Sequence, residues 1–162
     1  MNTEMMHSLV DRVIKVDRGG PESRIGKLLA VAEDYITLLN ADEGIIYYNT
    51  HHIKSLTYNA KDQTELDVDI PRKFSYIQAK DFQSVLGKLT LRWVKINRGG
   101  PETLEGLMNI GNPTDDFVTI VANEEIIRVS LFHIRNISYG VKVDKVNKDG
   151  KTKENNKQKD SK

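Results

Sequence analysis

The chain has 162 residues, no cysteine, 38% hydrophobic residues and a formal net charge of +1. This composition is typical of a soluble globular protein with room for one ordinary domain or two very small ones. It excludes disulfides, Cys-based zinc sites and thiol catalysis, and no apolar run approaches the ~20 residues of a membrane helix, so we expect no membrane partner.

The charge is unevenly distributed along the chain. Residues 141–162 hold eight lysines against four acidic residues, a surplus of +4 within a net +1, which leaves −3 for residues 1–140. A duplex-binding domain usually carries a basic face on its folded part, so nucleic acid is not an expected partner. The terminal segment lacks aromatic residues and is expected to be a disordered, Lys-rich tail.

The first predicted element is a short helix whose first turn is capped by Asn2 or Thr3. Its apolar side chains recur at helical spacing at Met6, Leu9, Val10 and Val13. The amino terminus lacks the basic and long apolar regions of a secretory signal, which predicts synthesis in the cytoplasm. Short strands with tight corners follow the helix. The first corner is Gly19-Gly20-Pro21, and the second strand is expected to begin near Gly26.

An internal repeat decides the architecture. Residues 12–23 recur as residues 92–103, 80 positions later, and Gly26 matches Gly106 at the same offset. The shared motif is Arg18-Gly19-Gly20-Pro21-Glu22 in the first copy and Arg98-Gly99-Gly100-Pro101-Glu102 in the second. After small insertions, residues 34–38 match 116–120, residues 45–46 match 126–127, and residues 52–58 match 133–139.

The second copy begins like the first. Asp81 is a predicted N-cap for a helix with apolar residues at Phe82, Val85, Leu86 and Leu89. In the next strand, Val94 and Ile96 are expected to point to one face, while Trp93, Lys95 and Asn97 point to the other.

These patterns predict a mainly β protein made of two tandem small SH3-like or Sm-like five-stranded β-barrels, each preceded by a short helix. The expected division is residues 1–59 for the first barrel, 60–80 for a linker, 81–140 for the second barrel and 141–162 for the tail. Within one copy, the order of features resembles that of the bacterial Sm-like RNA chaperone.

The repeated Arg-Gly-Gly-Pro-Glu motif reads first as a hairpin connection, because Gly permits positive φ and Pro presets its own φ. The Arg and Glu that flank the turn in both copies are candidates for matching halves of a subunit contact. No Gly-Lys-Ser/Thr follows, so the motif is not a phosphate loop.

The equivalent pairs His52-Ile53 and His133-Ile134 come before the last strand of each copy. No carboxylate or further His recurs beside both, so we interpret the histidines as turn residues with satisfied ring nitrogens. The sequence predicts no catalytic, metal-binding or cofactor-binding residue, and hence no enzyme.

The two motifs, the glycines that follow them and the closing His-Ile phrases resemble those of the spore coat protein B family of Bacillus over nearly all of residues 5–140. The resemblance implies a structural component of the outer spore coat, made in the mother cell and laid onto the forespore. It implies other coat proteins as partners and a coat-associated kinase acting on a Ser/Lys/Arg-rich tail. In this tail only Thr152 and Ser161 carry hydroxyls, so phosphorylation does not carry over directly.

A coat protein must self-associate or dock, and open edges of small barrels can pair with a neighbour. We expect a homo-oligomer formed through residues 45–48 and 126–129, by head-to-tail pairing that closes a ring or extends a filament. The alternative is an Sm-like RNA-binding module, favoured by strand order and by His51 at the pore-lining position of that family. Phe132 at the equivalent position and the acidic body speak against it.

Overall fold

The computed structural model describes residues 1–61, 75–112 and 114–139. Within them the same order of elements occurs twice. The first half, residues 1–61, contains α1 (Thr3–His7), β1 (Val13–Val16), β2 (Arg24–Val31), β3 (Tyr35–Asn40), β4 (Gly44–Asn49), the 3₁₀-helix η1 (Thr50–His52) and β5 (Leu56–Tyr58). The second half, residues 75–139, contains α2 (Phe82–Lys88), β6 (Trp93–Ile96), β7 (Leu104–Asn109), β8 (Phe117–Ala122), β9 (Glu125–Ser130), the 3₁₀-helix η2 (Leu131–His133) and β10 (Asn136–Tyr139).

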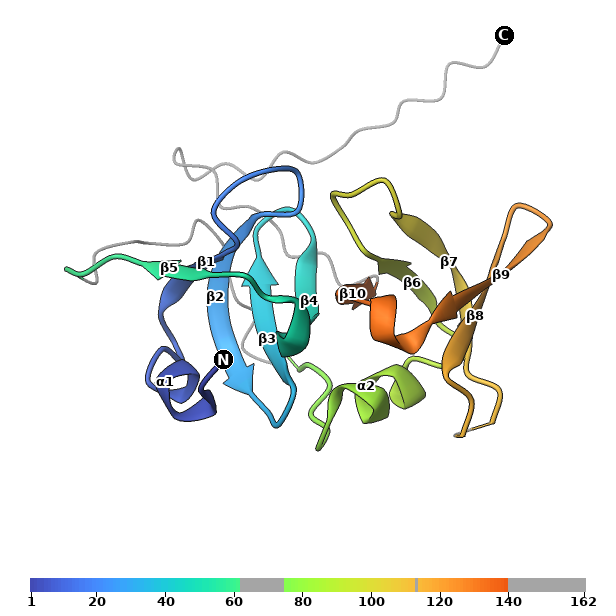
Figure 1. Cartoon of the computed structure of the whole chain (residues 1–162), viewed down its shortest axis with the longest axis horizontal. Helices are drawn as coiled ribbons and strands as arrows, with labels where there is room; N and C mark the ends of the chain where they lie inside the picture. Colours follow the sequence, from blue (N-terminus) through green and yellow to red (C-terminus); the bar gives the residue numbers. More distant parts are fainter. Residues whose placement is uncertain (62–74, 113, 140–162) are drawn as a thin grey trace, which may run out of the picture.

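The ten strands form one continuous antiparallel sheet in the order β5-β1-β2-β3-β4-β10-β6-β7-β8-β9 (Figure 1). Each half supplies five neighbouring strands in the same internal order, and the halves meet where β4 pairs with β10. The expected mainly β class with two short α-helices is confirmed. The expected division into two separate barrels is not confirmed, because hydrogen bonds between β4 and β10 merge the halves into one open sheet.

Both α-helices begin at predicted caps. Asn2 Oδ1 accepts a hydrogen bond from the Glu4 N–H at 2.8 Å, and Asp81 Oδ1 accepts one from the Ser84 N–H at 2.8 Å. The hydrogen bonds from Ser84 lower the pKa of the Asp81 carboxyl. The first helix is shorter than expected: it ends at His7, and Val13 already belongs to β1. Asp11 adopts a left-handed φ of 70° between them, which a helix cannot accommodate.

Two clusters of buried side chains lie on opposite faces of β3 and β4. On one face Ile36, Leu38, Ile46 and Tyr48 pack with Met6 and Leu9 of the α1 segment. On the other face Tyr35, Leu39, Ile45 and Tyr47 pack with the α2 residues Phe82 and Val85 and with the core of the second half. All six residues of β3 and five of the six in β4 are buried for this reason.

The end of the connector between the halves is docked on the sheet. The Tyr47 hydroxyl accepts a hydrogen bond from the Ile77 N–H at 2.7 Å. The Tyr35 hydroxyl accepts one from the Ala79 N–H at 2.9 Å and donates one to the Ala79 carbonyl at 2.7 Å. Burial raises the pKa of Tyr35 and of Tyr47. The preceding connector residues 62–74 and the predicted tail, 141–162, lie outside the described residues.

Candidate assembly surface

The halves are joined by a regular strand pair between β4 and β10, which we call the junction. Its opposed residues are Tyr48 with Asn136, Tyr47 with Ile137, and Ile46 with Ser138. The ladder continues past both strands, since the Asn49 N–H donates to the Arg135 carbonyl at 2.9 Å. Residues 45–48, one of two segments expected to mediate self-association, therefore lie between β3 and β10 and form no open edge. The interpretation of that segment as a contact between copies is corrected accordingly.

In each half, one residue just after the first strand fixes the loop that leads into the last strand. Asp17 and Asn97 both have left-handed backbones, with φ of 55° and 52°. Asp17 Oδ1 accepts hydrogen bonds from the backbone N–H groups of Lys54 and Ser55 at 2.8 and 3.2 Å. Asn97 Oδ1 accepts one from the Arg135 N–H at 2.8 Å. The alternation predicted for residues 93–97 stops at Ile96, where β6 ends. Asn97 is buried, unlike Trp93, and its amide donates a hydrogen bond to the His133 carbonyl at 3.0 Å.

The two Arg-Gly-Gly-Pro-Glu loops contact each other at the junction. A Cβ on Gly99 would lie 1.9 Å from the Pro21 carbonyl oxygen, so only glycine allows the second loop to approach the first this closely. Beside this contact the Glu22 carboxylate forms an ion pair with the Arg135 guanidinium. A Cβ on Gly100 would lie 2.6 Å from Glu22 Oε1. The motif of one half thus meets the motif of the other.

Glu43, in the turn between β3 and β4, forms the other charged contact across the junction. Its Oε1 lies 2.9 Å from Arg24 Nη2 of the same half and 3.0 Å from Arg98 Nη1 of the second half. The Glu43 side chain is only 10% exposed. The first motif thus contributes its Glu22 to the junction, and the second contributes its Arg98.

His52 and Phe132 close the opposite end of the strand pair. His52 Nε2 lies 2.5 Å from the Phe132 carbonyl oxygen, and the two rings meet edge to face with centroids 5.5 Å apart. His52 is therefore partnered through a ring nitrogen. Phe132 also contacts the ring of His133, with centroids 5.2 Å apart. These contacts connect η1 of the first half with η2 of the second.

The remaining predicted residues form none of these contacts between the halves. Gly26 and Gly106 are buried in β2 and β7, where a Cβ would meet the carbonyl oxygens of Leu39 and Val121 at 2.3 and 2.6 Å, so these glycines serve sheet packing. Ile134 is fully buried in the core of the second half, and Ile53 packs against the core of the first. Exposed residues of the two motifs are Arg18, Gly19, Gly20, Pro101 and Glu102. All of these except Glu102 line a pocket beside the contact between the motif loops.

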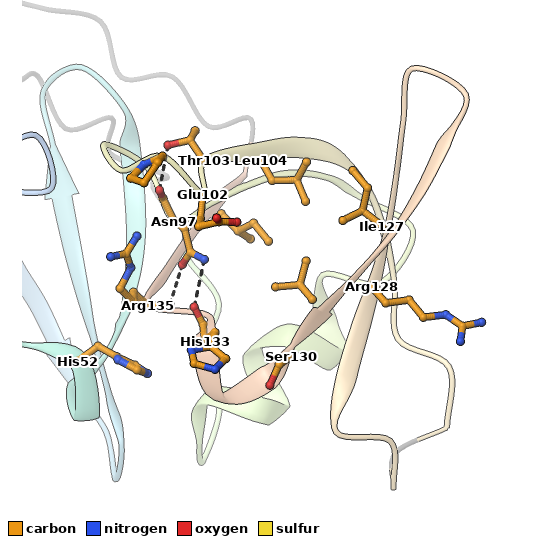
Figure 2. A pocket seen from close by; sticks show the side chains of 13 residues that line it. His52, Asn97, Glu102, Thr103, Leu104, Ile127, Arg128, Ser130, His133 and Arg135 are labelled. Carbon is orange, nitrogen blue, oxygen red and sulfur yellow. Dashed lines mark hydrogen bonds between the residues drawn. The ribbon is translucent and has the colours of Figure 1, made fainter.

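A cavity of about 680 Å³ lies between the second motif loop, β9 and η2, and His52 of the first half also lines it. Figure 2 shows the side chains around this cavity. Its walls include the apolar residues Leu104, Ile127 and Val129. His133 and Arg135 also line it, and the backbone of both residues is hydrogen-bonded to the Asn97 side chain. Val129 matches Tyr48 of the first half, where the larger side chain is buried in the core.

Within residues 1–61, 75–112 and 114–139, no group of three or more His, Asp or Glu side chains is arranged to hold a metal ion. Among the helices of the same residues, none combines the length and apolarity needed to cross a membrane.

Comparison with known proteins gives two matches of different extent. Residues 4–56 match the family model described as the YwrJ third domain. The chain is 38% identical over 146 residues to "Spore coat protein B" of Bacillus subtilis (strain 168), a stretch that covers 88% of this chain and 37% of that protein. The chain therefore spans little more than a third of the length of this curated relative. No solved structure matches the chain. On the identity across both halves, the chain belongs to the spore coat protein B family.

Proposed function

We propose that this protein is a structural component of the outer coat of bacterial endospores and acts by self-association and by docking to other coat proteins. The observation that carries the proposal is the 38% identity over 146 residues to a protein named for the spore coat. Because the chain covers 37% of that relative, the proposal concerns the coat role of this module and not the activities of the whole relative.

The form of the junction supports an adhesive role. The halves are joined by the backbone hydrogen bonds of a strand pair, by two charged contacts and by one apposed glycine loop. Such main-chain pairing is a general way of holding protein modules together. We accordingly assign no catalytic role to His52, His133 or the motif residues. The tandem-barrel domain division, the disordered tail and the action of a coat-associated kinase on Thr152 or Ser161 stay predictions.

Fractionation of sporulating cells tests the proposal. A tagged copy of the full chain, expressed from a mother-cell promoter in a sporulating Bacillus, should accumulate in the alkali- or detergent-extractable coat fraction of purified spores. A soluble protein that remains in the mother-cell lysate, with none in the coat extract, would contradict the proposal. A tagged soluble enzyme from the same promoter serves as the control for trapping.

RNA binding is the second candidate. Phe132 departs from the pore-lining His of the Sm-like family, but His51 on η1 and Phe132 on η2 occupy equivalent positions and both rings are exposed. Exposed rings of this kind can stack on unpaired bases. Filter binding with single-stranded RNA across a series of salt concentrations tests it. Binding that weakens with salt and is lost in a Phe132→Ala variant would favour this function, whereas no retention at low salt would exclude it.

A further inference from the structure

The two outer strands of the sheet are the counterparts of the two strands that pair at its centre. By position in their halves, β5 corresponds to β10 and β9 corresponds to β4. Within the described residues, β5 pairs with β1 alone and β9 with β8 alone. One chain therefore contains the formed β4–β10 pair at the centre of its sheet. It also contains an unpaired counterpart of each of these two strands, at opposite edges of the sheet.

Burial differs sharply between the paired strands and their unpaired counterparts. β4 is buried at five of six residues, whereas β9 is exposed or partly exposed at all six. β10 is buried at three of four residues, whereas β5 is exposed or partly exposed at all three. Ile126 of β9 is 72% exposed, although its counterpart Ile45 is completely buried. Open edges with apolar side chains tend to be covered by another strand.

We infer that a second copy of this chain adds its β5 to β9 of the first copy and so repeats the β4–β10 junction between chains. The inference rests on the self-association in the proposed function and specifies its surface. Transferring the internal register places Ser55 of the incoming copy opposite Val129, Leu56 opposite Arg128, and Thr57 opposite Ile127.

At the two ends, the motif-loop positions that correspond to the internal loop contact are uncovered. Inside the chain, Gly99 allows close approach to Pro21. Its counterpart Gly19 has no atom within 4 Å of a built Cβ, and the counterpart of Pro21, Pro101, is exposed. In the proposed contact the incoming Gly19 loop packs on Pro101. In the unpaired loop Gly20 has the positive φ and not Gly19, so this loop has to adopt the conformation of the Gly99 loop on association.

The charged residues at the ends are also complementary. The internal ion pairs Arg135–Glu22 and Arg98–Glu43 have as counterparts Lys54 with Glu102 and Arg18 with Glu124. All four of these side chains are exposed. The basic pair lies at the β5 end and the acidic pair at the β9 end, so head-to-tail contact joins opposite charges while contact between two like ends does not.

Because the contact uses different surfaces on each copy, it does not stop at a dimer. Head-to-tail addition closes into a ring or extends as a filament, and either form gives a multivalent scaffold of the kind a coat layer requires.

A proline in β9 tests the strand pairing. In the internal junction the Asn49 N–H points to the neighbouring strand, and alternation along a strand places the Tyr47 N–H on the same side. Arg128 is the counterpart of Tyr47, so Arg128→Pro removes an outward N–H and spares the ladder to β8. Arg128→Ala, which keeps the N–H, is the matched control.

Size-exclusion chromatography coupled to light scattering measures the mass of the assemblies. The full chain is studied over a range of protein concentrations. We expect assemblies larger than one chain for the wild type and for Arg128→Ala, and a single chain for Arg128→Pro with an unchanged circular dichroism spectrum. A wild-type monomer at the highest concentration, or assembly of Arg128→Pro equal to the wild type, would overturn the inference.

Charge exchange provides an independent test at exposed positions that leave the fold unchanged. Glu102→Lys and Lys54→Glu should each weaken association by roughly tenfold or more, because each places like charges in contact. The double variant restores an opposite pair between copies and should recover most of the loss. A double variant as weak as or weaker than the single variants would show that the two residues do not meet.

The coat fractionation described above separates this inference from the proposed function. If the protein is monomeric in solution but still enters the coat, the proposed coat role is retained and the proposed β9–β5 contact is refuted. If assembly is lost in Arg128→Pro and weakened in Glu102→Lys, but the wild type does not enter the coat, the β9–β5 contact is supported and the coat role is refuted.

Discussion

Gly99 is the residue through which the two motif loops touch, so its replacement by alanine perturbs the junction directly. A Cβ there would lie 1.9 Å from the Pro21 carbonyl oxygen and 2.9 Å from the Glu22 Cα, and the φ of Gly99 is +94°. A side chain on a left-handed backbone costs about 1–2 kcal/mol, and an extra methyl group forced into packed atoms about 1–3 kcal/mol. We expect Gly99→Ala to lower the free energy of unfolding by about 2–5 kcal/mol.

Urea unfolding followed by circular dichroism measures this loss, at protein concentrations low enough to keep copies apart. With a denaturant slope of about 2 kcal/mol per M, the midpoint should fall by about 1–2.5 M. Gly19→Ala is the matched control, because it changes the same motif position where a Cβ meets nothing within 4 Å, and we expect a change within about 0.5 kcal/mol. Equal unfolding free energies for the two variants would refute the contact between the loops.

Three further predictions concern buried polar groups. Glu43→Gln removes the carboxylate charge that Arg24 and Arg98 share and should lower the free energy of unfolding in urea by about 1–3 kcal/mol. The exposed counterpart Glu124→Gln should lower it by about 0.5 kcal/mol or less. Similar values for the two variants would contradict a role of the Glu43–Arg98 pair in the junction. Tyr47→Phe removes the acceptor of the Ile77 N–H and should cost about 1–2 kcal/mol, and an unchanged midpoint would mean that the connector is not docked. Burial raises the pKa of Tyr47 and of Tyr48 far above the usual value of about 10, so both stay protonated in the folded chain, and stability is lost as the pH rises above about 10. Tyrosinate absorbance and circular dichroism recorded together should show their ionisation only as the chain unfolds, and ionisation of all six tyrosines in a folded chain would disprove it.

Local elements were predictable because their signals are local. Asp81 and the spacing of Phe82, Val85, Leu86 and Leu89 define one amphipathic helix, and all four apolar side chains are buried as expected. The predicted alternation is also present in β6, where Val94 and Ile96 are buried and Trp93 is exposed. Asn97 escaped prediction because its left-handed backbone, which ends the alternation, depends on a loop 36 residues away.

The junction itself was not predictable from the repeat, since equivalent strands in the two halves have similar sequences. One signal was present: residues 45–48 are an unbroken apolar run, which indicates burial on both faces, whereas Arg128 interrupts the matching run in β9. No comparable difference separates Ser55-Leu56-Thr57-Tyr58 from Asn136-Ile137-Ser138-Tyr139. Only the three-dimensional arrangement shows which of these two segments occupies the centre of the sheet.

Disulfide trapping across the β9–β5 contact would test the assembly most directly, because the chain has no cysteine of its own. Thr57→Cys and Ile127→Cys in one chain place a thiol at each end of the sheet, at the counterparts of the opposed residues Ser138 and Ile46. Antiparallel residues in such non-hydrogen-bonded pairs have Cα atoms about 4.5 Å apart, within the range of about 4.4–6.8 Å that a disulfide spans. On mild oxidation we predict a series of covalent multimers, and few with Thr57→Cys and Val129→Cys, which lie two residues out of register. Monomers alone, or equal cross-linking by both pairs, would contradict the head-to-tail repetition of the internal junction.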